Sequence, residues 1–143
     1  MLEDSRIKIY EYLEGLVKGK VSDNVYWMNE PQELTESDVQ DGFIVIRVGD
    51  LIDESEFAYN TYNHARCYME VYIPPKSRGR IDKTKYTRYE TAMNAVINEA
   101  IAADYGDYSV QEDSVISVDA FETNNQNNTF FTFVKSFIVI IQD

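Results

Sequence analysis

The residues best suited to acid–base or nucleophilic chemistry are few in this 143-residue chain, which has one histidine and one cysteine. A catalytic histidine needs a nucleophile or carboxylate partner, and a reactive cysteine needs an electropositive, partly exposed setting. His64 falls on the outward phase of a predicted strand, and Cys67 falls on its inward phase. We therefore expect a surface or hydrogen-bonded histidine and a buried, inert thiol, with no catalytic residue and no enzyme activity.

Carboxylates are plentiful, but their spacing does not define a metal site. With 25 acidic residues in the chain, close pairs arise without catalytic design. Residues 50–54 lack the alternating oxygen ligands and central glycine of a calcium loop, and a single cysteine excludes a cysteine-rich zinc site. Residues 76–80 match neither a P-loop nor a dinucleotide-binding fingerprint. The sequence therefore predicts no metal site and no cofactor. The pairs are Asp38/Asp41, Asp50/Asp53, Glu54/Glu56, Asp104/Asp107 and Glu112/Asp113.

Positive charge is concentrated in one short segment of an acidic protein. The net charge is −12, which argues against a general nucleic-acid binder because phosphate binding depends on cationic surface. Residues 76–88 carry six basic residues and one acidic residue, a charge of +5, so the rest of the chain carries −17. We call residues 74–88 the basic arm. Its basic residues are Lys76, Arg78, Arg80, Lys83, Lys85 and Arg88.

The basic arm has two interpretations. It could be a solvated loop, or it could dock on an acidic surface such as that of another copy. Like-charged bodies repel over roughly a Debye length, about 8 Å at physiological salt, and an arm of opposite sign would offset that repulsion at close contact.

Two helices are predicted from apolar residues spaced three and four apart. The first runs from Asp4 or Ser5 to about Lys18, with a stripe of Ile7, Tyr10, Leu13 and Val17, and Gly19 is a plausible stop. The second runs from Lys85 or Thr87 to Ala103, with three alanines near its end that would allow close approach to a sheet. Its stripe is Tyr89, Met93, Val96, Ile97, Ala100 and Ile101.

Five strands are predicted around these helices, at about residues 25–28, 43–48, 63–74, 114–122 and 130–141. Residues 63–74 alternate strictly between two faces, and residues 43–48 are apolar enough for both faces to be covered. Residues 32–41 read as a loop with one helical turn near 36–38, and residues 53–62 as a wide hairpin connection. An asparagine-rich tip joins the last two strands into a long hairpin at about 114–142.

These elements predict one α+β domain spanning residues 1–143, in the order α-β-β-β-α-β-β. It would be a two-layer sandwich, with a mainly antiparallel sheet of four to five strands and two helices on one face. Outward aromatic side chains are of the type enriched at interfaces, which competes with ordinary core or surface placement. The candidates for an aromatic interaction surface are Phe57, Tyr59, Tyr62, Tyr68 and Tyr72.

The N-terminal residues argue against secretion. No apolar run approaches the roughly 18 residues of a membrane span, and the N-terminus is acidic where a signal peptide would be basic. We expect a soluble protein made in the cytoplasm.

The element order resembles the tail terminator, or tail completion, proteins of tailed bacteriophages. The resemblance runs through nearly the whole chain as a pattern of size and hydrophobicity, and it is most suggestive at residues 42–47, 65–71, 89–97 and 133–140. The basic arm and the C-terminal hairpin look longer than in a minimal version of that fold. No motif can be matched residue by residue, so no functional residue is transferred.

The resemblance implies a non-enzymatic virion protein. Members of that family form rings, commonly of six subunits, that cap the tail tube and contact neck proteins. In such a ring an acidic channel would repel passing DNA, so we expect DNA to cross it without specific binding. Ring closure needs two different complementary patches on each subunit, which a basic arm and an acidic body would supply. The alternatives are a small acidic adaptor or inhibitor in the cytoplasm, acting as a monomer or dimer, and a small-molecule enzyme using carboxylates and tyrosines.

Overall fold

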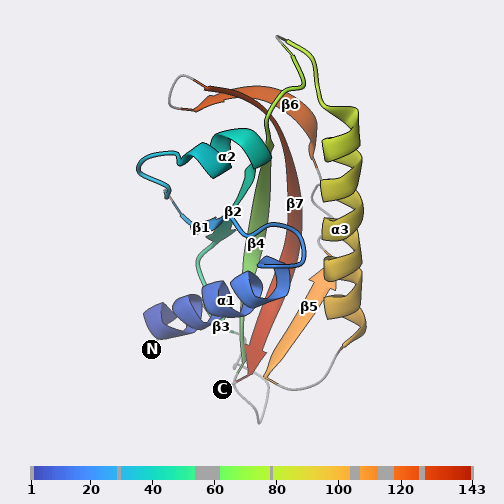
Figure 1. The fold of residues 1–143 in the computed structure, drawn as a ribbon. Helices are drawn as coiled ribbons and strands as arrows, with labels where there is room; N and C mark the ends of the chain where they lie inside the picture. Colours follow the sequence, from blue (N-terminus) through green and yellow to red (C-terminus); the bar gives the residue numbers. More distant parts are fainter. Residues whose placement is uncertain are drawn as a thin grey trace.

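The computed structural model describes residues 2–28, 30–53, 62–77, 79–103, 107–112, 118–125 and 128–142. Within these ranges three helices and seven strands follow one another in the order α1-β1-α2-β2-β3-β4-α3-β5-β6-β7 (Figure 1). The helices are α1 (Leu2–Val17), α2 (Glu36–Asp41) and α3 (Lys83–Ala102). The strands are β1 (Val25–Trp27), β2 (Phe43–Val48), β3 (Ile52–Asp53), β4 (Tyr62–Ile73), β5 (Tyr108–Glu112), β6 (Val118–Asn125) and β7 (Asn128–Gln142).

The strands form one mixed sheet in the order β1-β2-β4-β7-β5, with β3 paired to β4 and β6 paired to β7. β1 runs parallel to β2, whereas the other pairs are antiparallel. The α+β class is confirmed, but the prediction of a mainly antiparallel sheet in the order α-β-β-β-α-β-β is wrong. The cause is the crossover through α2, which returns the chain to the end where β1 began, so that β2 runs in the same direction.

α2 lies where the sequence predicts a loop with one helical turn. The Thr35 hydroxyl accepts a hydrogen bond from the backbone N–H of Asp38 at 3.1 Å, and the Thr35 N–H donates to the Asp38 carboxylate at 2.9 Å. This reciprocal capping box satisfies two backbone donors that a helix N-terminus otherwise leaves free. The helix therefore forms from its cap rather than from an apolar stripe.

The two longer helices confirm the predicted stripes with small changes. In α1, Tyr10, Leu13 and Val17 are buried, but Ile7 is 40% exposed and Ile9 takes its place in the core. α1 ends at Val17, shortly before Gly19, whose φ of 80° suits glycine. α3 begins at Lys83 rather than at Lys85 or Thr87. Its buried residues are Tyr89, Met93, Val96 and Ala100.

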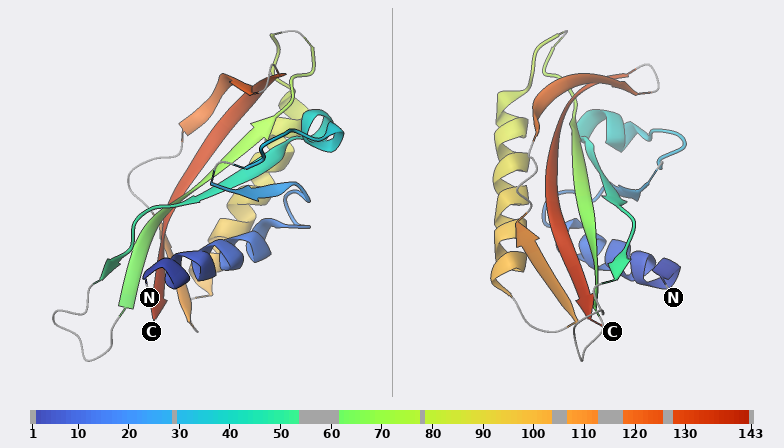
Figure 2. Two further views of the ribbon diagram at one scale, coloured as in Figure 1. Left: turned by 90° about the vertical axis from the view of Figure 1, so that its left-hand side faces the viewer. Right: turned by 180° about the vertical axis from the view of Figure 1, so that it is seen from behind.

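The main core lies between these two helices and one face of the sheet (Figure 2). The alternation predicted for β4 is confirmed, because Ala65, Cys67, Met69, Val71 and Ile73 are all fully buried on that face. Across the β4–β7 pair, Cys67 is opposite Phe137 and Val71 is opposite Phe133. We call this the helix face of the sheet and the opposite one the outer face.

A second, smaller core covers part of the outer face. Phe43 and Val45 of β2 and Phe130 of β7 are buried there, with Leu34 and Tyr72 packed against them. Ile44 and Ile46 lie in the main core, so β2 is covered on both faces, as its continuous apolar run predicts.

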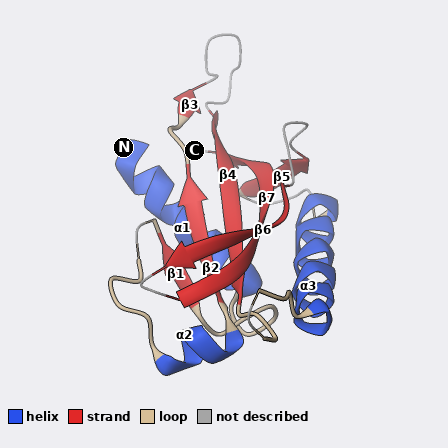
Figure 3. Ribbon diagram, turned by 90° about the horizontal axis from the view of Figure 1, so that it is seen from above, coloured by secondary structure: helices blue, strands red, loops and turns tan. Residues whose placement is uncertain are grey.

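The end of the chain forms the predicted long hairpin, because β6 pairs antiparallel with β7 up to Asn125 opposite Asn128. β6 curls across the top of the sheet (Figures 1 and 3). β5 was not predicted, and it occupies the lower part of the same edge of β7, from Tyr108 to Glu112. The predicted hairpin connection at 53–62 falls mostly on residues that the structure does not describe.

Candidate self-association surfaces

The predicted basic arm is divided between a short turn and the start of a helix. After β4 ends and two prolines follow, the Lys76 N–H donates to the Arg80 carbonyl at 3.1 Å, and the Arg80 N–H donates to the Ser77 carbonyl at 3.0 Å. Gly79 has a φ of 69°, which this tight turn requires. The connection rises beyond the end of the sheet and of α3 (Figure 1). Arg78 lies outside the described residues.

Three of the predicted arm residues form an exposed cationic group at this end of the molecule. Lys76 and Arg80 belong to the turn, Lys83 is the first residue of α3, and all three are exposed. Among the residues that the structure describes, none of the three takes part in an ion pair. We call Lys76, Arg80 and Lys83 the basic turn. A hollow of about 510 Å³ lies between the turn and the first residues of α3.

The other two described arm residues contact neighbouring groups. The Lys85 ammonium donates to the Gln40 carbonyl of α2 at 2.6 Å, which places a cation at the C-terminal end of that helix. The Arg88 guanidinium lies 5.0 Å from the centre of the Tyr89 ring, whose hydroxyl donates to the Asp41 carbonyl. Lys85 therefore joins α3 to α2, and it is less available to a partner than the basic turn.

The predicted aromatic surface is only partly described. Phe57 and Tyr59 lie outside the described residues, and Tyr62 is the first residue of β4. Tyr68 and Tyr72 share the outer face and are both half-buried. Tyr72 stacks on Phe43 with ring centres 4.5 Å apart, so it belongs to the second core.

A polar cluster on the outer face accompanies Tyr72. The Arg47 guanidinium is 3.0 Å from the Glu70 carboxylate, and the Tyr72 hydroxyl donates to that carboxylate at 3.2 Å. Burial, followed by the negative charge of Glu70, raises the pKa of Tyr72 to about 12. These contacts order the side chains across β2 and β4, as cross-strand pairs do.

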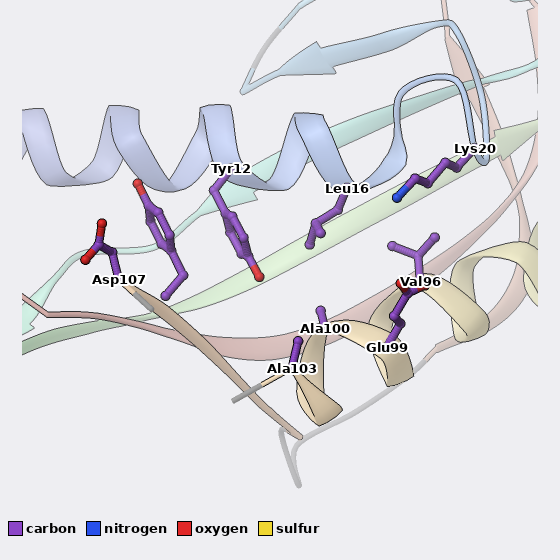
Figure 4. Close-up of a pocket in the computed structure, with 9 residues that line it drawn as sticks. Tyr12, Leu16, Lys20, Val96, Glu99, Ala100, Ala103 and Asp107 are labelled. Atoms are coloured by element: carbon purple, nitrogen blue, oxygen red, sulfur yellow. The ribbon is translucent and has the colours of Figure 1, made fainter. Parts of the chain in front are cut away.

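A cleft that the sequence does not predict lies between α1, the end of α3 and β5. Its volume is about 270 Å³. Tyr12 of α1 stacks on Tyr108 of β5 with ring centres 4.3 Å apart and planes 3° apart. Leu16, Val96 and Ala100 supply apolar lining (Figure 4). The nearest signal in the sequence is the alanine group at the end of α3, of which Ala100 and Ala103 line the cleft.

The cleft also carries charged side chains. Glu99 and Asp107 line it, and Lys20 reaches it from the connection after α1 (Figure 4). Burial raises the pKa of Tyr108, and the negative charges of Asp107 and then Glu11 raise it further. The two carboxylates place negative charge at the Tyr108 side of the cleft.

His64 and Cys67, the single histidine and cysteine of the chain, lie on opposite faces of the sheet. Cys67 lies on the helix face, so the prediction of a buried thiol is confirmed, and burial raises its pKa to about 12, which disfavours the reactive thiolate. His64 is half-buried on the outer face, opposite Ile140. The sheet therefore separates the two side chains and forms no His–Cys pair.

Over the described ranges, no three histidine, cysteine or acidic side chains gather closely enough to hold a metal ion. Nor does any helix in the described part of the chain have the length and apolar character to cross a bilayer.

Comparison with known proteins adds no family. No protein-family model matches the chain, and no curated protein matches it significantly.

Proposed function

We propose that this protein is a non-enzymatic virion component that assembles head to tail into a ring at the head–tail junction or tail end of a bacteriophage. The proposal rests on one observation, the segregation of charge. The basic turn is exposed at one end of α3. Residues 76–88 carry a charge of +5, and the rest of the chain carries −17, which gives the net charge of −12. Two unlike patches on one subunit are what a heterologous, ring-closing interface requires.

The net charge also suits a subunit that surrounds passing DNA. A surface dominated by carboxylates repels phosphates, so DNA would move through such a ring without adhering to it. Tail tube and neck proteins are the partners that this role implies. The basic turn would then contact protein rather than DNA.

The proposal is tested by the oligomeric state of the full chain. Size-exclusion chromatography with light scattering, followed by negative-stain electron microscopy, should show closed rings at high protein concentration. The variant Lys76→Ser/Lys83→Ser should shift the distribution toward monomers, because it removes two cations from the proposed contact. The matched control is Lys8→Ser/Lys18→Ser, which removes two exposed lysines of α1 and its C-terminal end and gives the same net charge of −14.

The outcomes separate the proposal from its alternative. Rings that both variants retain would remove the basic turn from the mechanism. A protein that stays monomeric at every concentration, and that is absent from purified phage particles of its source, would overturn the ring and favour an acidic adaptor.

A further inference from the structure

The cleft between α1, α3 and β5 has the chemistry to hold one long basic side chain. Its volume of about 270 Å³ is below the roughly 300–1,000 Å³ typical of small-molecule sites. Leu16, Val96 and Ala100 offer apolar surface to an aliphatic stem, as buried lysine and arginine stems prefer. Asp107 offers a carboxylate to a cationic head at the tyrosine end of the cleft, whereas Glu99 lies at the end where Lys20 enters (Figure 4).

Two other groups affect which head would bind. The stacked rings of Tyr12 and Tyr108 present aromatic surface near the cleft, and such faces attract guanidinium and ammonium groups. Lys20 faces the cleft from the side opposite α3 and would repel a cation placed beside it (Figure 4). A basic head is therefore best placed toward Asp107 and away from Lys20.

The basic turn of the same subunit cannot reach this cleft, whose lining already includes Lys20. The basic turn lies at the start of α3, and Ala100 and Ala103 lie at its end. A 20-residue helix spans about 30 Å, which exceeds the length of any side chain. An arginine or lysine of the basic turn can therefore enter the cleft only from another molecule, and a second copy of this chain offers a basic turn that is exposed at its far end.

We infer that the basic turn of one subunit inserts Arg80, flanked by Lys76, into the α1–α3–β5 cleft of the next subunit. This inference rests on the proposed head-to-tail assembly and names the contact that makes it. The turn and the cleft are different surfaces, so each subunit uses both once. Repetition of the contact gives a closed ring if the rotation between subunits closes, as for any heterologous interface.

Cross-linking between two single-site variants tests the contact directly. Ser77→Cys places a thiol on the exposed turn, and Ala103→Cys places one in the cleft. The native Cys67 can stay, because its thiol is buried with a pKa of about 12. Mixing the two variants with a short bis-maleimide should yield dimers. The control partner is Asn94→Cys, exposed on the same helix outside the cleft lining, which should not cross-link to Ser77→Cys.

Charge reversal tests the chemistry of the contact. Glu99→Lys/Asp107→Lys in the cleft partner changes its net charge from −12 to −8, which weakens general repulsion between copies. The inference nevertheless predicts a loss of cross-linked product of about tenfold or more, because like charges would meet in the cleft. Adding Lys76→Glu/Arg80→Glu to the turn partner should restore the product.

A matched control keeps the charge change and moves it away from the cleft. Glu30→Lys/Glu33→Lys, both exposed before α2, also gives −8 and should leave cross-linking intact or raise it. Circular dichroism checks that each variant folds.

The results separate this inference from the proposed function. Rings that form without 77–103 cross-links would overturn the contact and leave the ring standing. Cross-links that respond to charge reversal in a protein that builds no ring would support the contact and overturn the ring. Absence of both would overturn both.

Discussion

Asp38 is the described acidic side chain that is most fully engaged with the fold. It is fully buried, and both carboxylate oxygens accept from the Tyr26 hydroxyl at 2.8 Å. The same carboxylate accepts from the Thr35 N–H and so caps α2. One side chain therefore links β1 to the helix that follows it in the crossover.

Replacing Asp38 should destabilise the protein substantially. We expect Asp38→Ala to lower the free energy of unfolding by ~1.5–3 kcal/mol, because it leaves the Tyr26 hydroxyl and the Thr35 N–H without their charged acceptor. Urea unfolding measures the change. Asp41→Ala is the control in the same helix, since Asp41 is exposed and its loss should change stability by less than about 0.5 kcal/mol. Equal effects of the two variants would contradict this role.

Acidic groups whose pKa is raised in the folded protein predict a loss of stability in alkali. Burial raises the pKa of Cys67 from 9.0 to about 12 and is also the main cause of the rise in the pKa of Tyr26 from 10.0 to about 12. The folded state thus holds protons that the unfolded state releases from about pH 9 upward. Stability is therefore fully present below pH 9 and is lost as pH rises toward 12.

Denaturant unfolding at stepped pH, together with tyrosinate absorbance, measures this effect. The free energy of unfolding should be level up to about pH 9 and then fall, and part of the tyrosinate signal of the folded protein should appear well above pH 10. Tyr26→Phe should remove a portion of that late signal. Titration of all eleven tyrosines together near pH 10 would be incompatible with the structure.

Among elements, the junction between α2 and β2 depends on a single glycine. Gly42 has a φ of 93°, and a Cβ at this position would collide with the backbone carbonyl of Tyr72. The close approach lets β2 begin directly after α2 and pair with β4, with Phe43 opposite Tyr72.

The two glycines at 42 and 15 should therefore respond in opposite directions. Gly42→Ala should destabilise the fold by ~1–3 kcal/mol or more, through backbone strain and the collision with β4. Gly15→Ala should stabilise it by ~0.5–1 kcal/mol, because Gly15 lies in α1 with open space around it and alanine favours helix. Thermal unfolding of both variants provides the comparison. Destabilisation by Gly15→Ala would show that α1 packs differently.

The elements that the sequence predicts well are those with long periodic patterns. α1, α3 and β4 each repeat apolar residues over ten or more positions, and their buried faces follow from that spacing alone. α2 and β5 are short, with six and five residues. α2 depends on a cap at Thr35, and β5 depends on the free edge that β7 offers it. Neither a helix cap nor a free sheet edge produces a periodic pattern in the sequence.

At the scale of the whole molecule, the proposed assembly predicts a specific response to salt. The affinity of wild-type copies for one another should exceed that of Lys76→Ser/Lys83→Ser most at low ionic strength. The difference should shrink as salt rises, because the Debye length falls from about 30 Å at 0.01 M to about 3 Å at 1 M. Sedimentation velocity across a salt series measures it. A difference that stayed constant would assign the contact to apolar packing instead of charge.

The candidate surfaces show which site residues can be identified from charge and sequence pattern alone. Residues 76–88 stand out as basic from composition alone, and Lys76, Arg80 and Lys83 are exposed in the structure. Composition alone could not distinguish these three residues from Lys85, whose ammonium group donates a hydrogen bond to the Gln40 carbonyl. Lys85 differs from the other three because α2 lies beside the start of α3.

Local chemistry thus accounts for the α+β class, for the long helices and strands, and for the acidic surface with one basic segment, since these depend on neighbouring residues and on composition. The parallel β1–β2 pair, the second core around Phe43 and the cleft between Tyr12 and Tyr108 depend instead on residues far apart in the chain. Tyr12 and Tyr108 are brought together only when α1 and β5 pack around α3. Neither segment alone carries a sequence pattern that predicts this contact, because each tyrosine packs on a residue of a distant segment.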